Sequence, residues 1–411
     1  MKIIADLHVH SKYSRATSKD MDVETIALWA QRKGINLVGT GDFTHPAYLK
    51  ELKHNLKQQG NGLLTLKHSK NNIHFMLTTE VSNVYTLKGK TIRIHNIITA
   101  PSFEAADKIN KALSRFGRLD YDGRPIFGFS AKDLVKLIMD VSPESLIIPA
   151  HAWTPWYSVF GSNSGVDSIE ECFEEQTGHI YAIETGLSSD PPMNWRIESL
   201  DRITLVSNSD AHSPEKLGRE ANVFDCIMDY DEIATVIKTK DRKRFLYTIE
   251  FFPEEGKYHF DGHRSCNVSF SPAQTKQHNG LCPICGKPLT VGVLNRVETL
   301  ATRQEGIIPE NAIPFKHLIP LKEIIADTLS IGVNTVKVGK LYNEIVIDRG
   351  IQELEILEHL EEKELNQLMP VEITRSIMKV RQGMVDIVPG YDGTYGKIKI
   401  RSNHSDQPSL F

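Results

Sequence analysis

The stretch Lys2-Ile3-Ile4-Ala5-Asp6-Leu7-His8-Val9-His10 decides how the first half of this chain is interpreted. Its apolar residues favour a β-strand, and alternate side chains of a strand share a face, so Asp6, His8 and His10 lie on the same side. Burying an acid and two imidazoles on one face is costly unless something binds them. Imidazole and carboxylate are ligands for zinc, manganese or iron, so the pattern predicts a divalent metal site. A polar-faced edge strand is the alternative that this stretch alone leaves open.

Length and composition limit the class of protein. A chain of 411 residues is long enough for more than one domain, and 40% hydrophobic with 24% charged residues is ordinary for a soluble globular protein. The net charge of −4 gives no global signal for nucleic acid, so any DNA binding must come from local patches. We expect neither a signal segment nor a membrane span. Five cysteines, three of them close together, fit a reducing compartment and a metal site, so we predict a cytoplasmic protein.

Six further apolar segments are predicted to be strands, and most of them are separated by helical patterns. They are 35–39, followed by Asp42 and His45; 73–78, followed by Glu80; 91–98, which contains His95; 146–150, followed by His151; 180–183, followed by Glu184; and 203–207, followed by Asp210 and His212. Seven strands of this kind indicate α/β architecture. Reactive groups at the strand ends are typical of a (β/α) barrel, whereas an open doubly wound sheet would gather its ligands at one crevice.

Four short motifs in this order resemble those of the polymerase-and-histidinol-phosphatase (PHP) superfamily. They are Asp6-Leu7-His8-Val9-His10, Gly41-Asp42-Phe43-Thr44-His45, Pro149-Ala150-His151 and Ser209-Asp210-Ala211-His212, with Glu80 and His95 between them. The resemblance implies a distorted (β/α)7 PHP barrel that holds two or three divalent metals, which would be zinc, manganese, magnesium or iron. It implies as ligands His8, His10, Glu80, His95, His151, Asp210 and His212.

The second motif departs from the superfamily pattern. The superfamily usually has Asp and His adjacent, whereas here Phe43 and Thr44 separate Asp42 from His45, so which of these two is a metal ligand stays open. Glu184 could be a ligand or could bind an arginine across the rim.

A pair of metals about 3.5–4 Å apart can activate a bridging water and neutralise a phosphate under attack. The resemblance therefore predicts hydrolysis of a phosphate ester. We expect Asp210 and Glu80 to be the catalytic carboxylates, with Glu80 bridging the metals.

An aromatic loop follows His151. It contains Trp153, Trp156, Tyr157 and Phe160 among proline, glycine and serine residues. Aromatic side chains beside a phosphate-cleaving centre suit base stacking or insertion into a DNA duplex. A hydrophobic lid packed on the barrel is the alternative.

A second cluster of metal-binding residue types follows near the middle of the chain. His263-Arg264-Ser265-Cys266 is separated by fifteen residues from Cys282-Pro283-Ile284-Cys285-Gly286-Lys287. This HxxC and CxxC spacing is typical of a structural zinc site formed by His263, Cys266, Cys282 and Cys285, in which the metal supplies folding energy. His259 could replace His263, and His278 is a further candidate.

The remaining sequence is mainly helical and ends in a polar tail. The resulting division is 1–250 for the PHP barrel, 251–292 for the zinc module, 293–400 for a C-terminal mainly helical domain, and 401–411 for a flexible tail. The tail closes with Gln407-Pro408-Ser409-Leu410-Phe411. Gln407, Leu410 and Phe411 resemble the short peptide by which bacterial DNA repair enzymes dock on the sliding clamp.

These parts in this order resemble the endonuclease Q family of DNA repair nucleases. The resemblance implies cleavage by a metal-activated hydroxide on the 5′ side of uracil, hypoxanthine, xanthine or an abasic site, in double- or single-stranded DNA. The products would be a 3′-hydroxyl and a 5′-phosphate. The altered base would be flipped into a pocket between the barrel and the zinc module. The alternatives are a small-molecule phosphatase similar to histidinol phosphatases, and a non-catalytic DNA-binding scaffold with structural metals.

Overall fold

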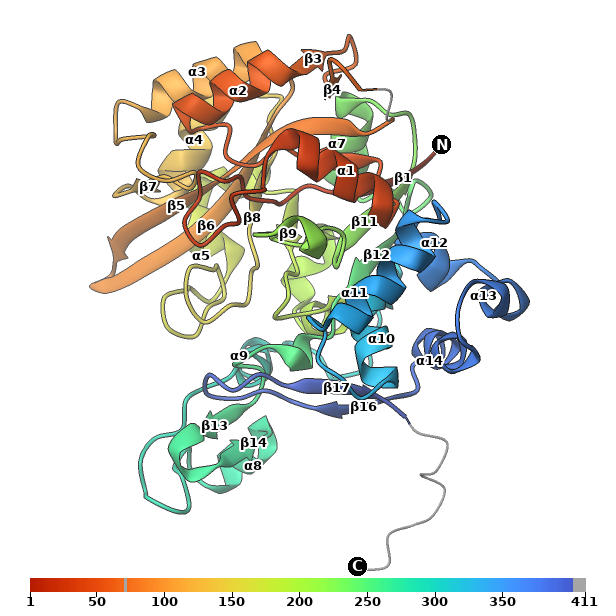
Figure 1. Ribbon diagram of the computed structural model, residues 1–411. Coiled ribbons are helices and arrows are strands. Elements are labelled where there is room, and N and C mark those ends of the chain that lie inside the picture. Colours follow the sequence, from red (N-terminus) through yellow and green to blue (C-terminus); the bar gives the residue numbers. More distant parts are fainter. Residues whose placement is uncertain (70–71, 402–411) are drawn as a thin grey trace, which may run out of the picture.

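The computed structural model describes residues 1–69 and 72–401. Its first half is a mixed α/β fold in which helices pack around the strands (Figure 1). Seven strands follow the predicted order: β1 (Lys2–Asp6), β2 (Leu37–Gly39), β5 (His74–Leu87), β6 (Lys90–Ala100), β8 (Ile147–Pro149), β9 (Ala182–Glu184) and β10 (Thr204–Val206). The prediction of an α/β fold is therefore confirmed.

Backbone pairing connects these strands into a nearly continuous series. β1 pairs with β2 and β2 with β5 in parallel, β6 lies antiparallel between β5 and β8, and β9 pairs in parallel with β10. Beyond the strand ends, Ala152 N donates to Glu184 O at 2.9 Å, and His10 N donates to Ala211 O at 3.0 Å. These bonds bring the end of β1 beside the segment after β10, and the end of β8 beside β9.

The β5–β6 hairpin differs from its prediction. The two strands were expected to end at residues 78 and 98, but β5 continues to Leu87 and β6 runs antiparallel to it. Glu80 consequently lies within a strand rather than beyond its end, whereas His95 lies within its strand as predicted. Ser82 is the direct partner of His95, and Glu80 lies two residues before Ser82, so Glu80 and His95 share one face of the sheet.

Helix α1 (Val23–Lys33) begins and ends at residue types that are typical of helix termini. Asp22 accepts a hydrogen bond from Thr25 N at 2.9 Å at the start of the helix, and Gly34 ends it with a φ of 90°. The other helices of the first half are α2 (Pro46–Asn55), α3 (Phe103–Leu113), α4 (Ala131–Val141), α5 (Ile169–Phe173), α6 (Pro191–Trp195) and α7 (Tyr230–Thr239).

Helix α2 is followed directly by a short strand. It ends at Asn55, and the next residues form β3 (Leu56–Gln58), which pairs with β4 (Leu64–Leu66). The remaining strands of the first half are β7 (Ile126–Phe127), β11 (Ala221–Asp225) and β12 (Phe245–Glu250).

The second half contains a small module, a set of helices and a hairpin. The module holds the antiparallel strands β13 (Asp261–His263) and β14 (Val268–Phe270) and the helix α8 (Pro272–Gln277), which lie together at one end of the molecule (Figure 1). The helices are α9 (Val293–Leu300), α10 (Leu321–Thr328), α11 (Val336–Tyr342), α12 (Glu353–Glu358), α13 (Glu362–Leu368) and α14 (Val371–Arg381). The strands are β15 (Phe315–His317), which extends the barrel sheet beside β12, and the hairpin β16 (Val385–Val388) with β17 (Lys397–Ile400).

Contacts cross both of the predicted domain boundaries. Phe260 N donates to Gly390 O at 2.9 Å, so the C-terminal hairpin contacts the module. Lys33 of the barrel forms a buried ion pair with Glu353 at 2.7 Å. The division at residues 250 and 292 stays a proposal. Within the described ranges, no helix combines the length and apolarity that crossing a bilayer requires.

Candidate functional site

Two groups of side chains at the strand ends could each hold a metal ion. His8, His10 and Asp210 form one group, and Glu80, His95 and His151 form the other; within each group, the candidate ligand atoms lie within 4.8 Å of one another. Glu80 connects the groups, because its Oε2 lies 3.3 Å from His10 Nε2 and its Oε1 lies 3.1 Å from His151 Nε2. The structure thus brings six of the predicted ligands into one cluster, called the barrel cluster below.

Two further carboxylates lie behind the barrel cluster and contact its imidazoles. Glu184 lies 3.1 Å from His8 Nδ1, and Asp42 lies 3.1 Å from His10 Nδ1. When Nδ1 of the neutral ring donates to the carboxylate, Nε2 carries no proton and can bind a metal ion at the centre of the cluster. Glu184 also accepts from Asn208 Nδ2 at 2.9 Å and from His151 N at 2.7 Å. These contacts hold the imidazoles in the orientation that a metal ligand requires.

Three atoms at the centre fit a cation. Nε2 of His8, Nε2 of His10 and Oδ1 of Asp210 are buried and have no hydrogen-bond partner. The 3.1 Å separation between His10 Nε2 and Asp210 Oδ1 lacks hydrogen-bond geometry. Buried polar atoms without partners are costly, and a divalent ion would satisfy all three.

The electrostatics of the barrel cluster favour positive charge. Burial opposes ionisation of Glu80, but the neighbouring His95 and Arg124 hold the pKa of this carboxyl well below its usual range. Burial likewise opposes charge on His8, yet Glu184 and Asp210 raise the pKa of its imidazole well above its usual value. A cation at this position would be stabilised by the same carboxylates.

The backbone at the barrel cluster is strained. Asp42, His151 and Asp210 have φ values of 46°, 29° and 48°, in the left-handed region that residues with a side chain rarely adopt. Gly186 packs against His151, and a Cβ at this glycine would lie 2.6 Å from His151 Cβ. Such conformations persist only when surrounding structure imposes them, and they concentrate at functional sites.

The structure does not bring every predicted ligand into the two groups. Oδ2 of Asp42 accepts from Ser11 N at 2.6 Å and from Ser14 Oγ at 2.9 Å, so this carboxylate is fully engaged behind His10. His45 stacks on Tyr13, with ring centres 4.4 Å apart, and belongs to neither group. The ring of His212 lies 4.5 Å from that of His10, and its Nδ1 contacts Asp210 O at 2.9 Å, so it borders the cluster.

The aromatic loop divides into a buried and an exposed part. Trp153 and Phe160 are 0% and 1% exposed, with ring centres 4.7 Å apart, and Trp153 Nε1 donates to Asn194 Oδ1. Burial removes these two from any surface that could contact DNA, which agrees with the lid alternative for this part of the loop. Trp156 is 39% exposed and packs edge-on against Tyr258 of the module, whereas the Tyr157 ring lies 4.7 Å from that of His95.

A cavity of about 270 Å³ lies beside the exposed part of this loop. Trp156 forms one wall, and Tyr258, His259 and Tyr395 line it from the side of the module and the C-terminal hairpin. Its position between the barrel and the module agrees with the region where the sequence led us to expect a base pocket.

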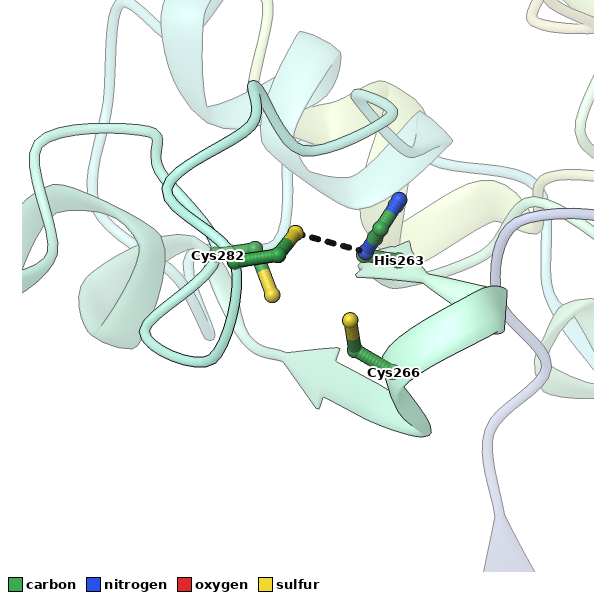
Figure 2. Close-up of side chains that lie close together, drawn as sticks. His263, Cys266 and Cys282 are labelled. Atoms are coloured by element: carbon green, nitrogen blue, oxygen red, sulfur yellow. Dashed lines mark hydrogen bonds between the residues drawn. The ribbon is translucent and has the colours of Figure 1, made fainter.

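The second cluster consists of His263, Cys266, Cys282 and Cys285, and is called the cysteine cluster below. Their ligand atoms lie within 4.8 Å of one another, and Cys285 Sγ lies 3.5 Å from His263 Nδ1. Figure 2 shows the side chains of His263, Cys266 and Cys282 directed toward a common point. Three thiols and one imidazole are a donor set that suits tetrahedral zinc.

Neither alternative histidine belongs to the cysteine cluster. His259 is buried against the cavity described above, and His278 stacks on Phe270 with ring centres 4.7 Å apart.

Sequence reasoning missed two residues near the barrel cluster. Arg124 Nη1 donates to Glu80 Oε2 at 2.9 Å, and Asn208 joins Glu184 to the backbone of Leu7. The segment 114–126 contains three arginines, and three of its aromatic or aliphatic residues are more than half exposed. The three arginines were the available signal in the sequence for Arg124. Nothing in the sequence around Asn208 distinguishes it.

No protein-family profile matches the chain. An uncharacterised protein of Methanocaldococcus jannaschii is 33% identical over 299 residues, which cover 70% of this chain; the match spans only 36% of that longer relative. The uncharacterised protein YqxK of Bacillus subtilis is 28% identical over 97% of this chain and 99% of its own length.

Two crystal structures match the chain over nearly its whole length. One is the lesion-specific endonuclease Q of Pyrococcus furiosus, with a TM-score of 0.87, 31% identity, and coverage of 100% of this chain and 98% of that chain. The other is endonuclease Q in complex with a 27-mer duplex that has an abasic lesion at the active site, with a TM-score of 0.84, 31% identity, and coverage of 98% and 97%. Identity at this level, sustained along both chains, shows that this protein belongs to the endonuclease Q family.

Proposed function

We propose that the chain is a DNA repair endonuclease that hydrolyses the phosphodiester bond 5′ to a deaminated base or an abasic site. The deaminated bases would be uracil, hypoxanthine and xanthine, and the products a 3′-hydroxyl and a 5′-phosphate. The observation that carries this proposal is the pair of ligand groups that share Glu80. The full-length similarity to a lesion-specific endonuclease, also known in complex with abasic DNA, supports the nucleic-acid substrate.

We propose that His8, His10 and Asp210 hold one divalent ion and that Glu80, His95 and His151 hold a second. When bound, the ions would supply Lewis acidity to the phosphate and lower the pKa of a water molecule. Glu184 and Asp42 orient the imidazoles of His8 and His10 by accepting from Nδ1. Burial of these groups excludes bulk water from one side of the scissile phosphate.

We propose that the cysteine cluster holds one structural zinc ion. A closed site of three thiolates and one imidazole leaves no open position for a substrate, so its role would be to stabilise the module. The module would then support the wall of the 270 Å³ cavity that Tyr258 lines.

We propose that this cavity receives the altered base. Enzymes that inspect a base must take it out of the stack, and a cavity of this size lined by Trp156, Tyr258 and Tyr395 offers aromatic surfaces for stacking. Replacing Trp156 by Ala should weaken binding of a uracil-containing duplex by about ten-fold, since base–aromatic stacking contributes about 1–3 kcal/mol. Equal affinity of the variant and the wild type in a titration would contradict this assignment.

The predicted clamp-binding residues Gln407, Leu410 and Phe411 lie outside the described residues. We keep their docking on a sliding clamp as a proposal, since a Leu-Phe pair can anchor in an apolar pocket. Removal of residues 407–411 should abolish co-purification with the clamp and leave nicking of free DNA unchanged. A DNA substrate also agrees with the predicted cytoplasmic location.

A nicking assay tests the central proposal. Duplexes that contain one uracil, hypoxanthine, xanthine or abasic site are incubated with the wild type and with Asp210→Ala, beside an undamaged duplex of the same sequence. We expect one nick on the 5′ side of the lesion, none in the undamaged duplex, and a loss on the order of 10³-fold or more in the variant. Equal cutting of undamaged DNA would remove the lesion specificity. Turnover of histidinol phosphate without nicking would favour a small-molecule phosphatase.

A further inference from the structure

Among the described residues, Arg124 is the one arginine or lysine whose side chain contacts Glu80, the carboxylate that joins the two ligand groups. Its Nη1 lies 2.9 Å from Glu80 Oε2, the oxygen that also lies 3.3 Å from His10 Nε2. The Glu80 side chain is fully buried, whereas 24% of the Arg124 side chain is exposed. The guanidinium therefore extends from the buried centre of the barrel cluster to its open side.

The backbone around Arg124 is fixed against the same cluster. Arg124 N donates to Asp122 Oδ1 at 3.1 Å, and Gly123 N donates to Tyr13 O at 3.1 Å. A Cβ on Gly123 would collide with Ser14 and Asp42, so only glycine allows this close approach. The backbone contacts of Gly123 and Arg124 thus fix the position from which the guanidinium extends.

The guanidinium has more donors than its observed contact uses. A guanidinium carries several N–H groups in a planar fork, and among residues 1–69 and 72–401 its only recorded acceptor is Glu80. The negative charge of Asp210, a candidate ligand of the other group, also acts on this guanidinium, and 28% of the Asp210 side chain is exposed. Arg124 and Asp210 are thus both partly open to solvent at the barrel cluster, and the fork of arginine matches phosphate oxygens.

We propose that Arg124 is a catalytic residue that donates hydrogen bonds to a non-bridging oxygen of the scissile phosphate. This inference rests on the proposed function. Charge accumulates on those oxygens during attack at phosphorus, so a fixed guanidinium stabilises the transition state more than the bound substrate. Its contact with Glu80 holds the guanidinium in place before the DNA arrives.

The first experiment compares Arg124→Ala and Arg124→Lys with Arg118→Ala in single-turnover nicking of an abasic duplex. Arg118 lies on the same loop and pairs with Asp120 on the surface, so it is a matched control. We expect Arg124→Ala to lose on the order of 10²- to 10³-fold in rate, Arg124→Lys to recover part of it, and Arg118→Ala to match the wild type. Elemental analysis of each variant should give unchanged metal content. A parallel loss of metal would show that Arg124 acts only through Glu80 and would overturn the proposal.

The second experiment replaces each non-bridging oxygen of the scissile phosphate by sulfur in turn. In the wild type, sulfur at the oxygen that Arg124 contacts should slow nicking, and this slowing should shrink in Arg124→Ala because the contact is already absent. The other diastereomer should be slowed equally in both proteins. If both sulfur effects are the same in the variant as in the wild type, Arg124 does not touch the phosphate. A wild type that fails to nick any lesion contradicts the proposed function instead, so the two failures are distinguishable.

Discussion

The barrel cluster draws its candidate ligands from segments that extend from His8 to Asp210, whereas the cysteine cluster draws its own from the stretch between His263 and Cys285. The two clusters also differ in what surrounds them. Large sets of buried apolar residues enclose the barrel. Among the described residues, the module has a small apolar cluster in which Val268, Cys282 and Leu289 are buried and Cys266 and Phe270 are partly buried. A core of that size supplies little of the free energy that ordering a module requires.

The comparison indicates opposite relations between metal and fold. In the barrel, the core imposes left-handed backbone on His151 and Asp210, so the fold creates a site that a metal then enters. In the module, few contacts exist without the metal, so the metal would create the fold. The three predictions below test this contrast, from the largest expected effect to the smallest.

The largest effect should follow Cys282→Ser. This residue is a candidate zinc ligand and is also one of the three buried residues in the apolar cluster of the module. A closed zinc site contributes on the order of 10 kcal/mol to folding at neutral pH, so its loss should unfold residues 261–290. Hydrogen exchange followed by mass spectrometry should give lost protection in this range and unchanged protection in β1, β5 and β6, with one equivalent of zinc lost.

Cys226→Ser is the control for this variant, because Cys226 is a buried cysteine of the barrel outside the cysteine cluster. It should keep the zinc and the protection of the module. Protection that survives in the module of Cys282→Ser would mean that the metal does not create its fold. Loss of protection throughout the barrel would mean that the two regions fold as one unit.

A smaller effect should follow Glu184→Gln in the barrel. Oε1 of Glu184 accepts from Asn208 Nδ2 and Oε2 accepts from His151 N, and both oxygens lie 3.1 Å from His8 Nδ1. A glutamine has one oxygen, so its amide nitrogen would face one of these donors and would no longer match His8 Nδ1 on that side. Outer partners of metal ligands typically contribute 10- to 100-fold to metal affinity or activity, so nicking should fall by about that factor. Thermal unfolding of the barrel should change little, because the core remains intact.

Glu170→Gln is the matched control, since Glu170 pairs with Arg202 on the surface. It should leave nicking unchanged. If Glu184→Gln instead unfolds the barrel, the carboxylate supports the fold more than the site, and the contrast between the two regions weakens.

Sequence reasoning located the strands and the candidate ligands of the barrel because their signals are local. An apolar run followed by a His, Asp or Glu predicts a strand end with a ligand, and four of the six residues in the barrel cluster are close to such an end. His95 was predicted within its strand, whereas Glu80 was predicted beyond the end of a strand that in fact continues past it. Continuation of β5 and β6 as a hairpin depends on pairing between the two strands, which neither segment reveals alone.

The local sequence could not decide matters of burial and of contacts between distant segments. Trp153 and Trp156 lie three residues apart in the same loop, yet the first is buried against Phe160 and the second is exposed. Likewise, Asp42 and His45 both follow β2, but only Asp42 contacts His10. Each outcome depends on which distant side chain lies opposite, and a single sequence does not contain that information.

The smallest effect should follow Asp392→Asn, which tests what else supports the module. Asp392 of the C-terminal hairpin accepts from Arg264 N at 2.6 Å and from Thr290 Oγ1 at 2.7 Å, so it links both ends of the module. Its φ of 41° is tolerated by asparagine, and the amide oxygen can still accept from Arg264 N. The loss is then the charge assistance to two hydrogen bonds, about 1 kcal/mol, or about a five-fold faster exchange of amide hydrogens in the module.

Asp386→Asn on the same hairpin is the control, because Asp386 pairs only with the exposed Arg401 among the described residues. Faster exchange in Asp392→Asn than in Asp386→Asn would mean that the hairpin contributes to the stability of the module even when zinc is bound. Equal exchange in the two variants would leave the metal as its main support. In that case, the stability of the module would come mainly from the four zinc-binding side chains, whereas the stability of the barrel comes from its whole apolar core. The contrast between the two regions would then be sharper than the contacts of Asp392 suggest.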